Sequence, residues 1–162
     1  MQENRDQSRE KFMQEAIKLA ASNLNSGKGG PFGAIVVKNG EIIGRGANLV
    51  TSTNDPTAHA EIVAIRDACK NLNSFQLDGC EIYASCEPCP MCLGAIYWAR
   101  PSHLYFAASR EDAAKAGFDD SYIYQQVPLK PIDRDIKSLQ LLQQDAVQVF
   151  TLWNASDQKI PY

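Results

Sequence analysis

Apolar positions recur along this chain with two different periods, and the change of period marks its elements. From residue 12 to residue 24 they recur every three to four positions, and Gly27 follows, which predicts an amphipathic helix with a stop. Two apolar-rich runs, residues 32–38 and 41–48, flank an Asn-Gly pair. Such a pair between two strand-like runs predicts a two-residue β-hairpin.

Helical and strand patterns alternate after the hairpin. The hairpin strands are antiparallel, whereas later strands joined by helical crossovers run parallel to each other. This order predicts an α/β sandwich in a single domain, residues 1–162, since we find no repeat or linker that divides the chain. We expect further helices at residues 57–72, 90–99, 110–116 and 143–154, and further strands at residues 80–85 and 103–108.

Charge and composition narrow the function classes. The formal net charge is −3, and lysine and arginine form no cluster, which disfavours a polynucleotide partner on electrostatic grounds. The N-terminal residues are polar, and no apolar run approaches the roughly 20 residues that span a bilayer. We therefore expect a cytoplasmic protein without a membrane partner. In that reducing compartment, the five cysteines are expected to be metal ligands, catalytic thiols or buried thiols.

Two short motifs carry the candidate chemistry: His59-Ala60-Glu61 and Pro88-Cys89-Pro90-Met91-Cys92. A Cys-x-x-Cys pair alone is ambiguous, because it also suits a redox couple, half of a structural zinc site or two buried thiols. Together with one imidazole, however, the pair supplies three zinc ligands, and no fourth partner is suitably spaced. Three protein ligands with an open position are typical of catalytic zinc.

The predicted positions of these residues favour the same interpretation. Each motif opens a helix, and the partial positive charge of a helix N-terminus stabilises thiolates. Glu61 follows His59 by two residues, so that its carboxylate can lie beside the metal and move protons to and from a water molecule. Cys86 also has a valid x-x spacing to Cys89, but Pro88 and Pro90 favour Cys89 and Cys92 as the ligands. We interpret Cys86 as a thiol at a strand end.

The pattern H-x-E followed by P-C-x-x-C is the signature of zinc-dependent nucleobase deaminases, and the chain resembles the cytidine deaminase superfamily. The resemblance implies a three-layer α/β/α sandwich around a mixed five-stranded sheet. It also implies one zinc ion per subunit, held between the N-termini of two helices by His59, Cys89 and Cys92, with Glu61 as the catalytic proton carrier.

Longer stretches are similar to the small zinc-dependent guanine deaminases of bacteria, from about residue 12 to the end, most weakly at residues 125–142. They are GGPFGA at residues 29–34, NDPTAHAE at 54–61, SCEPCPMCLGAI at 85–96 and AGFDD at 116–120, with the terminal Tyr162.

This second resemblance implies a set of roles at the substrate. Asp120 would contact the purine and assist proton transfer as a second catalytic residue, and Asn48 would hydrogen-bond to the purine. Tyr162 would close the pocket from a C-terminal segment, residues 143–162, that two subunits of a homodimer exchange. The other substrate-binding positions would be Phe32, Ala60 and Trp98.

The implied reaction is the hydrolysis of guanine to xanthine and ammonia. Glu61 would pass the proton of the attacking water to N3 and, with Asp120, protonate the amine that leaves C2. A guanosine deaminase and then a tRNA adenosine deaminase are the alternative enzymes, although ribose needs room that a pocket closed by Tyr162 lacks. A non-catalytic zinc or thiol protein is a further alternative, but it leaves Glu61 without a role.

Overall fold

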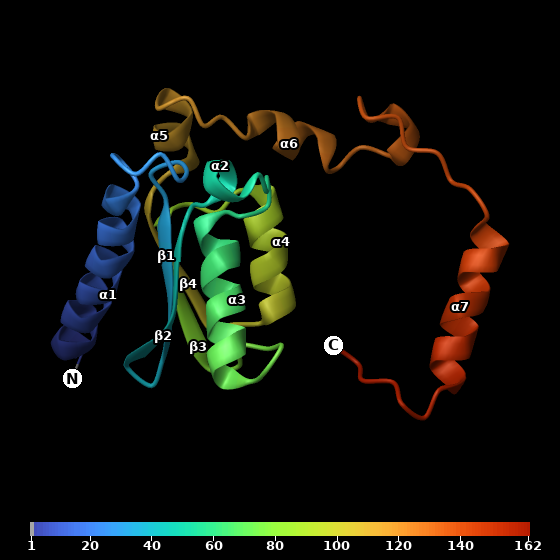
Figure 1. Cartoon of the computed structure of the whole chain (residues 1–162), viewed down its shortest axis with the longest axis horizontal. Coiled ribbons are helices and arrows are strands. Elements are labelled where there is room, and N and C mark those ends of the chain that lie inside the picture. The colour runs from blue at the N-terminus through green and yellow to red at the C-terminus, as the bar shows by residue number, and fades with distance from the viewer. Residues whose placement is uncertain (1) are drawn as a thin grey trace. The chain divides into compact units, whose positions relative to one another are not determined.

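The structure is a computed structural model that describes residues 2–162. The chain forms two compact units, the first ending at Asp120 and the second running from Ser121 to Tyr162 (Figure 1). In order, the first unit contains α1 (Gln2–Ser22), β1 (Gly33–Lys38), β2 (Glu41–Ala47), α2 (Val50–Thr53), α3 (Ala60–Leu72), β3 (Cys80–Cys86), α4 (Pro90–Ala99), β4 (His103–Ala108) and α5 (Arg110–Lys115). The second unit contains α6 (Ser121–Gln126), the 3₁₀ turn η1 (Pro131–Asp133) and α7 (Gln143–Ala155).

The first unit is built on a mixed sheet with strand order β2-β1-β3-β4. β1 runs antiparallel to β2 and to β3, whereas β3 and β4 are parallel and are joined through α4. The predicted hairpin is confirmed, because Lys38 pairs with Glu41 and the two residues between them, Asn39 and Gly40, both have positive φ. Positive φ at both positions is what a type I′ turn requires.

The expectation of five strands was wrong, since residues 2–162 contain four. The chain after β4 forms only short helices, η1, α7 and connecting coil. An extended segment among these elements has no strand to pair with inside its own unit, so its backbone N–H and C=O groups cannot form a ladder. The α/β class and the mixed sheet are as expected.

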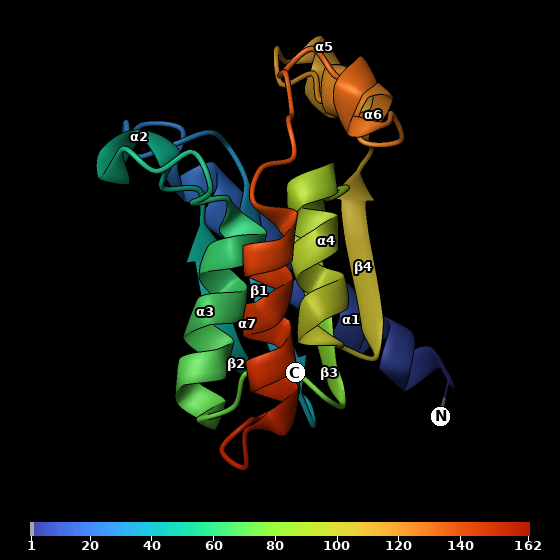
Figure 2. The same cartoon turned by 90° about the vertical axis from the view of Figure 1, so that its right-hand side faces the viewer.

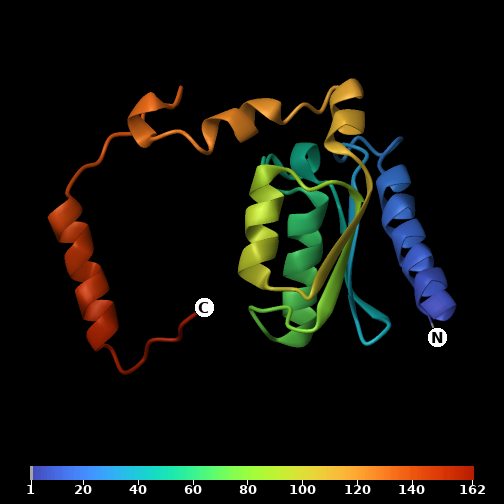
Figure 3. The same cartoon turned by 180° about the vertical axis from the view of Figure 1, so that it is seen from behind.

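Helices cover both faces of this sheet, as the three-layer prediction requires. α3 and α4 lie side by side on one face and α1 lies on the other (Figures 1, 2 and 3). Alternate residues of β1 serve the two layers: Ala34 and Val36 pack with α3 and α4, whereas Ile35 and Val37 pack with α1. Because both faces of β1 are buried, its sequence is a continuous apolar run.

Two buried glycines in β2 let α3 approach the sheet closely. A Cβ atom added at Gly46 would clash with the carbonyl oxygen of Ala60, and one added at Gly44 would lie 2.6 Å from the carbonyl oxygen of Ala64. Three alanines of α3, Ala60, Ala64 and Ala68, face these glycines. Small residues on both sides therefore set the height of α3 above β2, including the height of its first turn.

The second unit carries many large apolar side chains that are exposed in the single chain. On α7 these include Val149, Phe150, Leu152 and Trp153, and on the preceding coil Leu139, Leu141 and Leu142. No helix in the described part of the chain is long and apolar enough to cross a membrane.

Candidate active site and metal centre

His59 is held at the point where α3 begins. It occupies the N-cap position, with extended backbone angles (φ −68°, ψ 156°), and its side chain is not used for capping. A turn stabilised by the Asp55 carboxylate, which accepts hydrogen bonds from the N–H and the hydroxyl of Thr57, leads into this position. The predicted helix at residues 57–72 therefore starts three residues later, which leaves the imidazole free to face a neighbouring helix.

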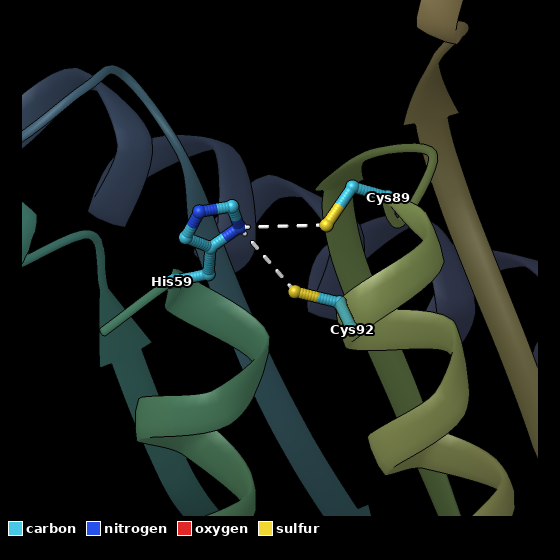
Figure 4. A group of neighbouring side chains, drawn as sticks. All are labelled: His59, Cys89 and Cys92. Carbon is cyan, nitrogen blue, oxygen red and sulfur yellow. Dashed lines mark hydrogen bonds between the residues drawn. The ribbon is translucent and has the colours of Figure 1, made fainter. Parts of the chain in front are cut away.

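The two cysteines occupy the matching position on α4. Cys89 is the N-cap residue, Pro90 takes the first helical position, and Cys92 lies one turn inside, fully buried. Proline is well tolerated at that first position because the N–H it lacks would have no helical partner. Since α3 and α4 lie side by side and begin at the same end of the sheet, the three side chains converge (Figures 1 and 4).

The distances within this cluster fit a zinc ion. His59 Nδ1 lies 3.6 Å from Cys89 Sγ and 3.5 Å from Cys92 Sγ, and all three ligand atoms lie within 4.8 Å of one another (Figure 4). Zinc bonds of about 2.0–2.1 Å to nitrogen and 2.3 Å to sulfur, at tetrahedral angles, separate N and S by about 3.6 Å. The side chains therefore already stand at the spacing that a shared zinc ion needs.

The donor set is that of a catalytic metal. Among the described residues, His59, Cys89 and Cys92 are the one group of three or more potential ligands that meets this spacing. Cys86 lies outside it, because its buried thiol donates to the carbonyl oxygen of Ser109 (3.5 Å) and burial raises its pKa to about 11. Three protein ligands leave one position of a tetrahedral zinc ion open to water or substrate.

The cluster also stabilises the anionic ligand that zinc prefers. Hydrogen bonds from the Cys92 thiol and from the His59 ring lower the pKa of Cys89 to about 4. The bond with Cys89 in turn raises the pKa of His59, so thiolate and imidazolium stabilise each other. The pKa of the Cys92 thiol is raised because it donates to Cys89 and is buried. Cys89 thus resembles the low-pKa thiols found at helix N-termini.

Glu61 lies beside the cluster without belonging to it. The residue is 8% exposed, and one carboxylate oxygen lies 3.5 Å from the Cys92 sulfur atom. Burial raises the pKa of this carboxyl group. A carboxyl group that is buried next to a metal site, with a raised pKa, is suited to accept a proton and to return it.

Two of the predicted substrate contacts lie in the first unit on the loops beside β1 and β2. Asn48 is 6% exposed and directly follows β2, and Phe32 directly precedes β1. The ring of Phe32 meets that of Phe118 edge to face, with centroids 4.9 Å apart. Ala60, which is buried, is the first residue of α3, between His59 and Glu61.

Of the neighbouring Asp119 and Asp120, Asp120 is the better placed for a role at the metal cluster. It is half-buried, and its pKa is raised first by burial and then by the charge of Cys89, whereas Asp119 is exposed. An effect of the Cys89 charge on Asp120 requires that the two groups lie near each other. The catalytic role of Asp120 stays a prediction, but its side chain is in the electrostatic reach of the metal cluster.

The remaining two predicted contacts are not brought to the cluster within the first unit. Trp98 lies on the last turn of α4, 64% exposed, and the six residues from Cys92 correspond to about 9 Å of helix. Tyr162 belongs to the second unit. Their roles in substrate binding stay predictions.

Two residues near the site had no assigned role in the sequence analysis. Phe118 packs against Phe32, and its position in the AGFDD stretch could have indicated a role at the site. Asn23 is buried and bonds to Gly30 and Asn48, but nothing in the local sequence indicates partners so far along the chain.

Comparison with known proteins agrees with this geometry. Residues 6–108 match the family model described as the cytidine and deoxycytidylate deaminase zinc-binding region. The guanine deaminase of Bacillus subtilis is 52% identical over 153 residues, which cover 94% of this chain and 98% of that protein. A tRNA-specific adenosine deaminase of Aquifex aeolicus is 44% identical over 62% of this chain and 66% of its own length.

Solved structures of two guanine deaminases are also similar to this chain. The crystal structure of the Bacillus subtilis guanine deaminase superposes with a TM-score of 0.92 at 52% identity, covering 94% of this chain and 98% of that one. A guanine deaminase from Nitrosomonas europaea gives a TM-score of 0.64 at 36% identity, over 67% of this chain and 63% of that one. The chain therefore belongs to the cytidine and deoxycytidylate deaminase zinc-binding family, and it resembles a bacterial guanine deaminase over nearly its whole length.

Proposed function

We propose that this chain is a zinc-dependent guanine deaminase that converts guanine and water into xanthine and ammonia. The observation that carries the reaction class is the buried Glu61 carboxylate beside a three-ligand His/Cys cluster. The substrate is supported by the 52% identity to a guanine deaminase over 94% of the chain. The similar tRNA adenosine deaminases match 61–73% of the chain, less than the 94% matched by the guanine deaminase, and a net charge of −3 does not favour an RNA partner.

One zinc ion per chain would be held by His59, Cys89 and Cys92. When bound, zinc lowers the pKa of a coordinated water molecule toward neutrality and so supplies a nucleophile. The spacing of the three ligand atoms and the low pKa of Cys89 support this assignment.

Proton transfer would be the task of Glu61. Its carboxylate takes a proton from the attacking water and delivers it to N3 of the purine, which makes C2 more electrophilic. The hydroxyl group now on C2 then gives its proton, through the same carboxyl group, to the amino group on C2. The C2–N bond breaks, ammonia leaves, and the C2 carbonyl of xanthine remains. The raised pKa of Glu61 suits this role, because burial makes the protonated carboxyl group easier to form than it is in water.

Recognition of the purine would be shared by loops of the first unit. Asn48 accepts a hydrogen bond at Oδ1 from the N–H of Val50 (3.1 Å), which leaves its NH₂ group to donate to an acceptor on the purine. Phe32 offers an aromatic wall that Phe118 holds in place. Asp120 would stand near the departing amine and accept a hydrogen bond from it.

We further propose that two copies form a dimer by exchanging their C-terminal segments, residues 143–162, and that each partner's Tyr162 closes the other's pocket. Large apolar side chains are exposed on both units of the single chain, among them Tyr97, Trp98 and Phe106 in the first unit and Phe150 and Trp153 in α7. Such an amount of exposed apolar surface is typical of an interface. A monomer in sedimentation velocity would contradict the exchange.

All five cysteines are free thiols, which agrees with a cytoplasmic location.

A substrate panel tests the proposed function. The zinc-loaded protein is incubated separately with guanine, guanosine, adenine and cytidine, and ammonia release is measured. We expect release from guanine and little from the other three. Release mainly from guanosine would refute the choice of substrate while keeping the reaction class, and no release from any of the four would refute the reaction class.

A further inference from the structure

Asn23 joins two loops that are distant in the sequence. The residue directly follows α1, is 5% exposed, and uses its side-chain amide in two directions. Nδ2 donates to the carbonyl oxygen of Gly30 (3.0 Å) and to that of Asn48 (2.7 Å). The hydroxyl of Ser26 lies within hydrogen-bond distance of both the main-chain oxygen (3.1 Å) and Oδ1 (3.3 Å) of Asn23, so the orientation of the amide is defined chiefly by its two donor bonds.

The first of these loops carries Phe32, and it packs directly against Asn48. A Cβ atom added at Gly29 would clash with both the carbonyl oxygen and Oδ1 of Asn48, so the backbone of residue 29 lies in contact with that side chain. The N–H of Asn48 donates to the carbonyl oxygen of Phe32 (3.1 Å). These contacts hold Asn48 and the loop that carries Phe32 in one fixed arrangement.

The second loop fixes how the Asn48 amide points. Asn48 Oδ1 accepts a hydrogen bond from the N–H of Val50, and the main-chain oxygen of Asn48 accepts one from Asn23 Nδ2. Removing the Asn23 amide would leave the buried carbonyl oxygen of Asn48 and the partly buried one of Gly30 without that donor, which costs free energy unless the backbone moves to find another. Such a movement would turn the Asn48 side chain and shift the start of β1, where Phe32 lies.

We propose that Asn23 is a positioning residue for purine recognition: its amide ties Gly30 to Asn48 and thereby sets the Asn48 amide and the Phe32 ring at the spacing the substrate needs. The proposal rests on the proposed function, since Asn48 and Phe32 are its substrate contacts. Asn23 bonds to neither the zinc ligands nor Glu61, so its effect falls on binding of the purine and not on the chemical step.

The test separates KM from kcat. Asn23→Asp keeps the shape of the side chain but lacks the N–H donors, and Gly29→Ala disturbs the same contact from the opposite side. Asn71→Ala is the control: it removes an amide of α3 that donates to the carbonyl oxygen of Ile43 (2.8 Å), an exposed bond from a side-chain amide to the main chain at the other end of β2. For each variant we would measure KM and kcat with guanine, the inhibition constant of xanthine, and the zinc content.

Asn23→Asp and Gly29→Ala are expected to raise KM and the xanthine inhibition constant roughly tenfold or more, because the hydrogen bonds from Asn23 to Gly30 and Asn48, or their geometry, are lost. Values of kcat and zinc content should stay close to wild type, and Asn71→Ala should leave KM unchanged.

An unchanged KM in both site variants would overturn the proposal. A loss of zinc and kcat at constant KM would overturn it too, because it would show a purely structural role. An equal rise of KM in Asn71→Ala would have the same consequence. A wild-type protein that releases no ammonia from guanine would refute the proposed function and this inference together, whereas an active wild type with unaffected variants would refute the inference alone.

Discussion

Gly46 controls how closely the first turn of α3, and with it His59 and Glu61, lies on the sheet. We therefore expect Gly46→Ala to weaken zinc binding although residue 46 touches none of the ligands. In the present structure, the new Cβ atom would clash with the Ala60 carbonyl oxygen and lie 2.5 Å from the Ala64 nitrogen, whereas ordinary contacts begin at 3.4 Å. The N-terminal part of α3 must recede by about 1 Å to relieve this overlap.

The consequences differ for stability and for metal binding. Overpacking of this kind lowers the free energy of unfolding by about 1–3 kcal/mol. His59 now lies 3.5 and 3.6 Å from the two sulfur atoms, and zinc sites tolerate distance changes of only about 0.2 Å. A displacement several times larger should lower zinc affinity by at least tenfold, comparable to the loss of an outer-shell partner, which costs about 10–100-fold.

Gly44→Ala provides the matched control. Its Cβ atom would lie 2.6 Å from the Ala64 carbonyl oxygen and 2.7 Å from the Ala68 Cβ, farther along the same helix from His59. Urea unfolding of the zinc-free proteins would give the two stabilities, and competition with a chromophoric chelator would give the two zinc affinities. We expect similar losses of stability and a loss of zinc affinity for Gly46→Ala alone. Equal zinc affinities in the two variants would refute the idea that β2 sets the position of His59.

Three further predictions, tested with four substitutions, separate the roles of named side chains. Glu61→Gln should lower kcat for guanine by at least about 10²–10⁴-fold while zinc stays bound, since general acid–base catalysis contributes that much; near-normal turnover would remove Glu61 from its role. Cys92→Ser should abolish stoichiometric zinc binding in a metal analysis, whereas Cys86→Ser should retain it, because the Cys86 thiol lies outside the ligand group; the reverse result would mean that Cys86 is the ligand. Tyr83 is buried, and its hydroxyl donates a hydrogen bond to Glu81 (2.6 Å). Burial, and then this hydrogen bond, raise the pKa of Tyr83 above its ordinary value of 10.0. The stability that the protonated hydroxyl contributes is therefore full below pH 10.0 and is lost as the pH rises through the folded-state pKa. Thermal unfolding should therefore show the stability gap between wild type and Tyr83→Phe narrowing above that pH, and a gap that widens would contradict this sign.

The sequence predicted the elements whose signals are local. The Asn-Gly pair fixed the hairpin because both residues accept positive φ, and the apolar period predicted the last helix at residues 143–154, close to the observed Gln143–Ala155. The clustering of His59, Cys89 and Cys92 could be predicted because each lies at or next to a helix start, where spacing along the chain nearly determines position in space.

Features that depend on distant partners could not be predicted in the same way. A fifth strand was expected from the resemblance, but a strand exists only where another strand pairs with it, and the pairing partner is not encoded in the segment itself. Asn23 looks like an ordinary polar residue after a helix, and its role follows only from contacts with Gly30 and Asn48. Gly46 likewise has its meaning only once α3 is packed on β2.

The dependence of guanine turnover on zinc tests the central claim most directly. The protein is stripped of metal with a chelator, zinc is added back in steps, and xanthine formation is followed at each step. The account predicts no turnover in the stripped protein and a linear recovery that ends at one equivalent of zinc per chain, the capacity of the His59, Cys89 and Cys92 cluster. Full turnover without zinc, or no xanthine at any zinc level, would contradict it.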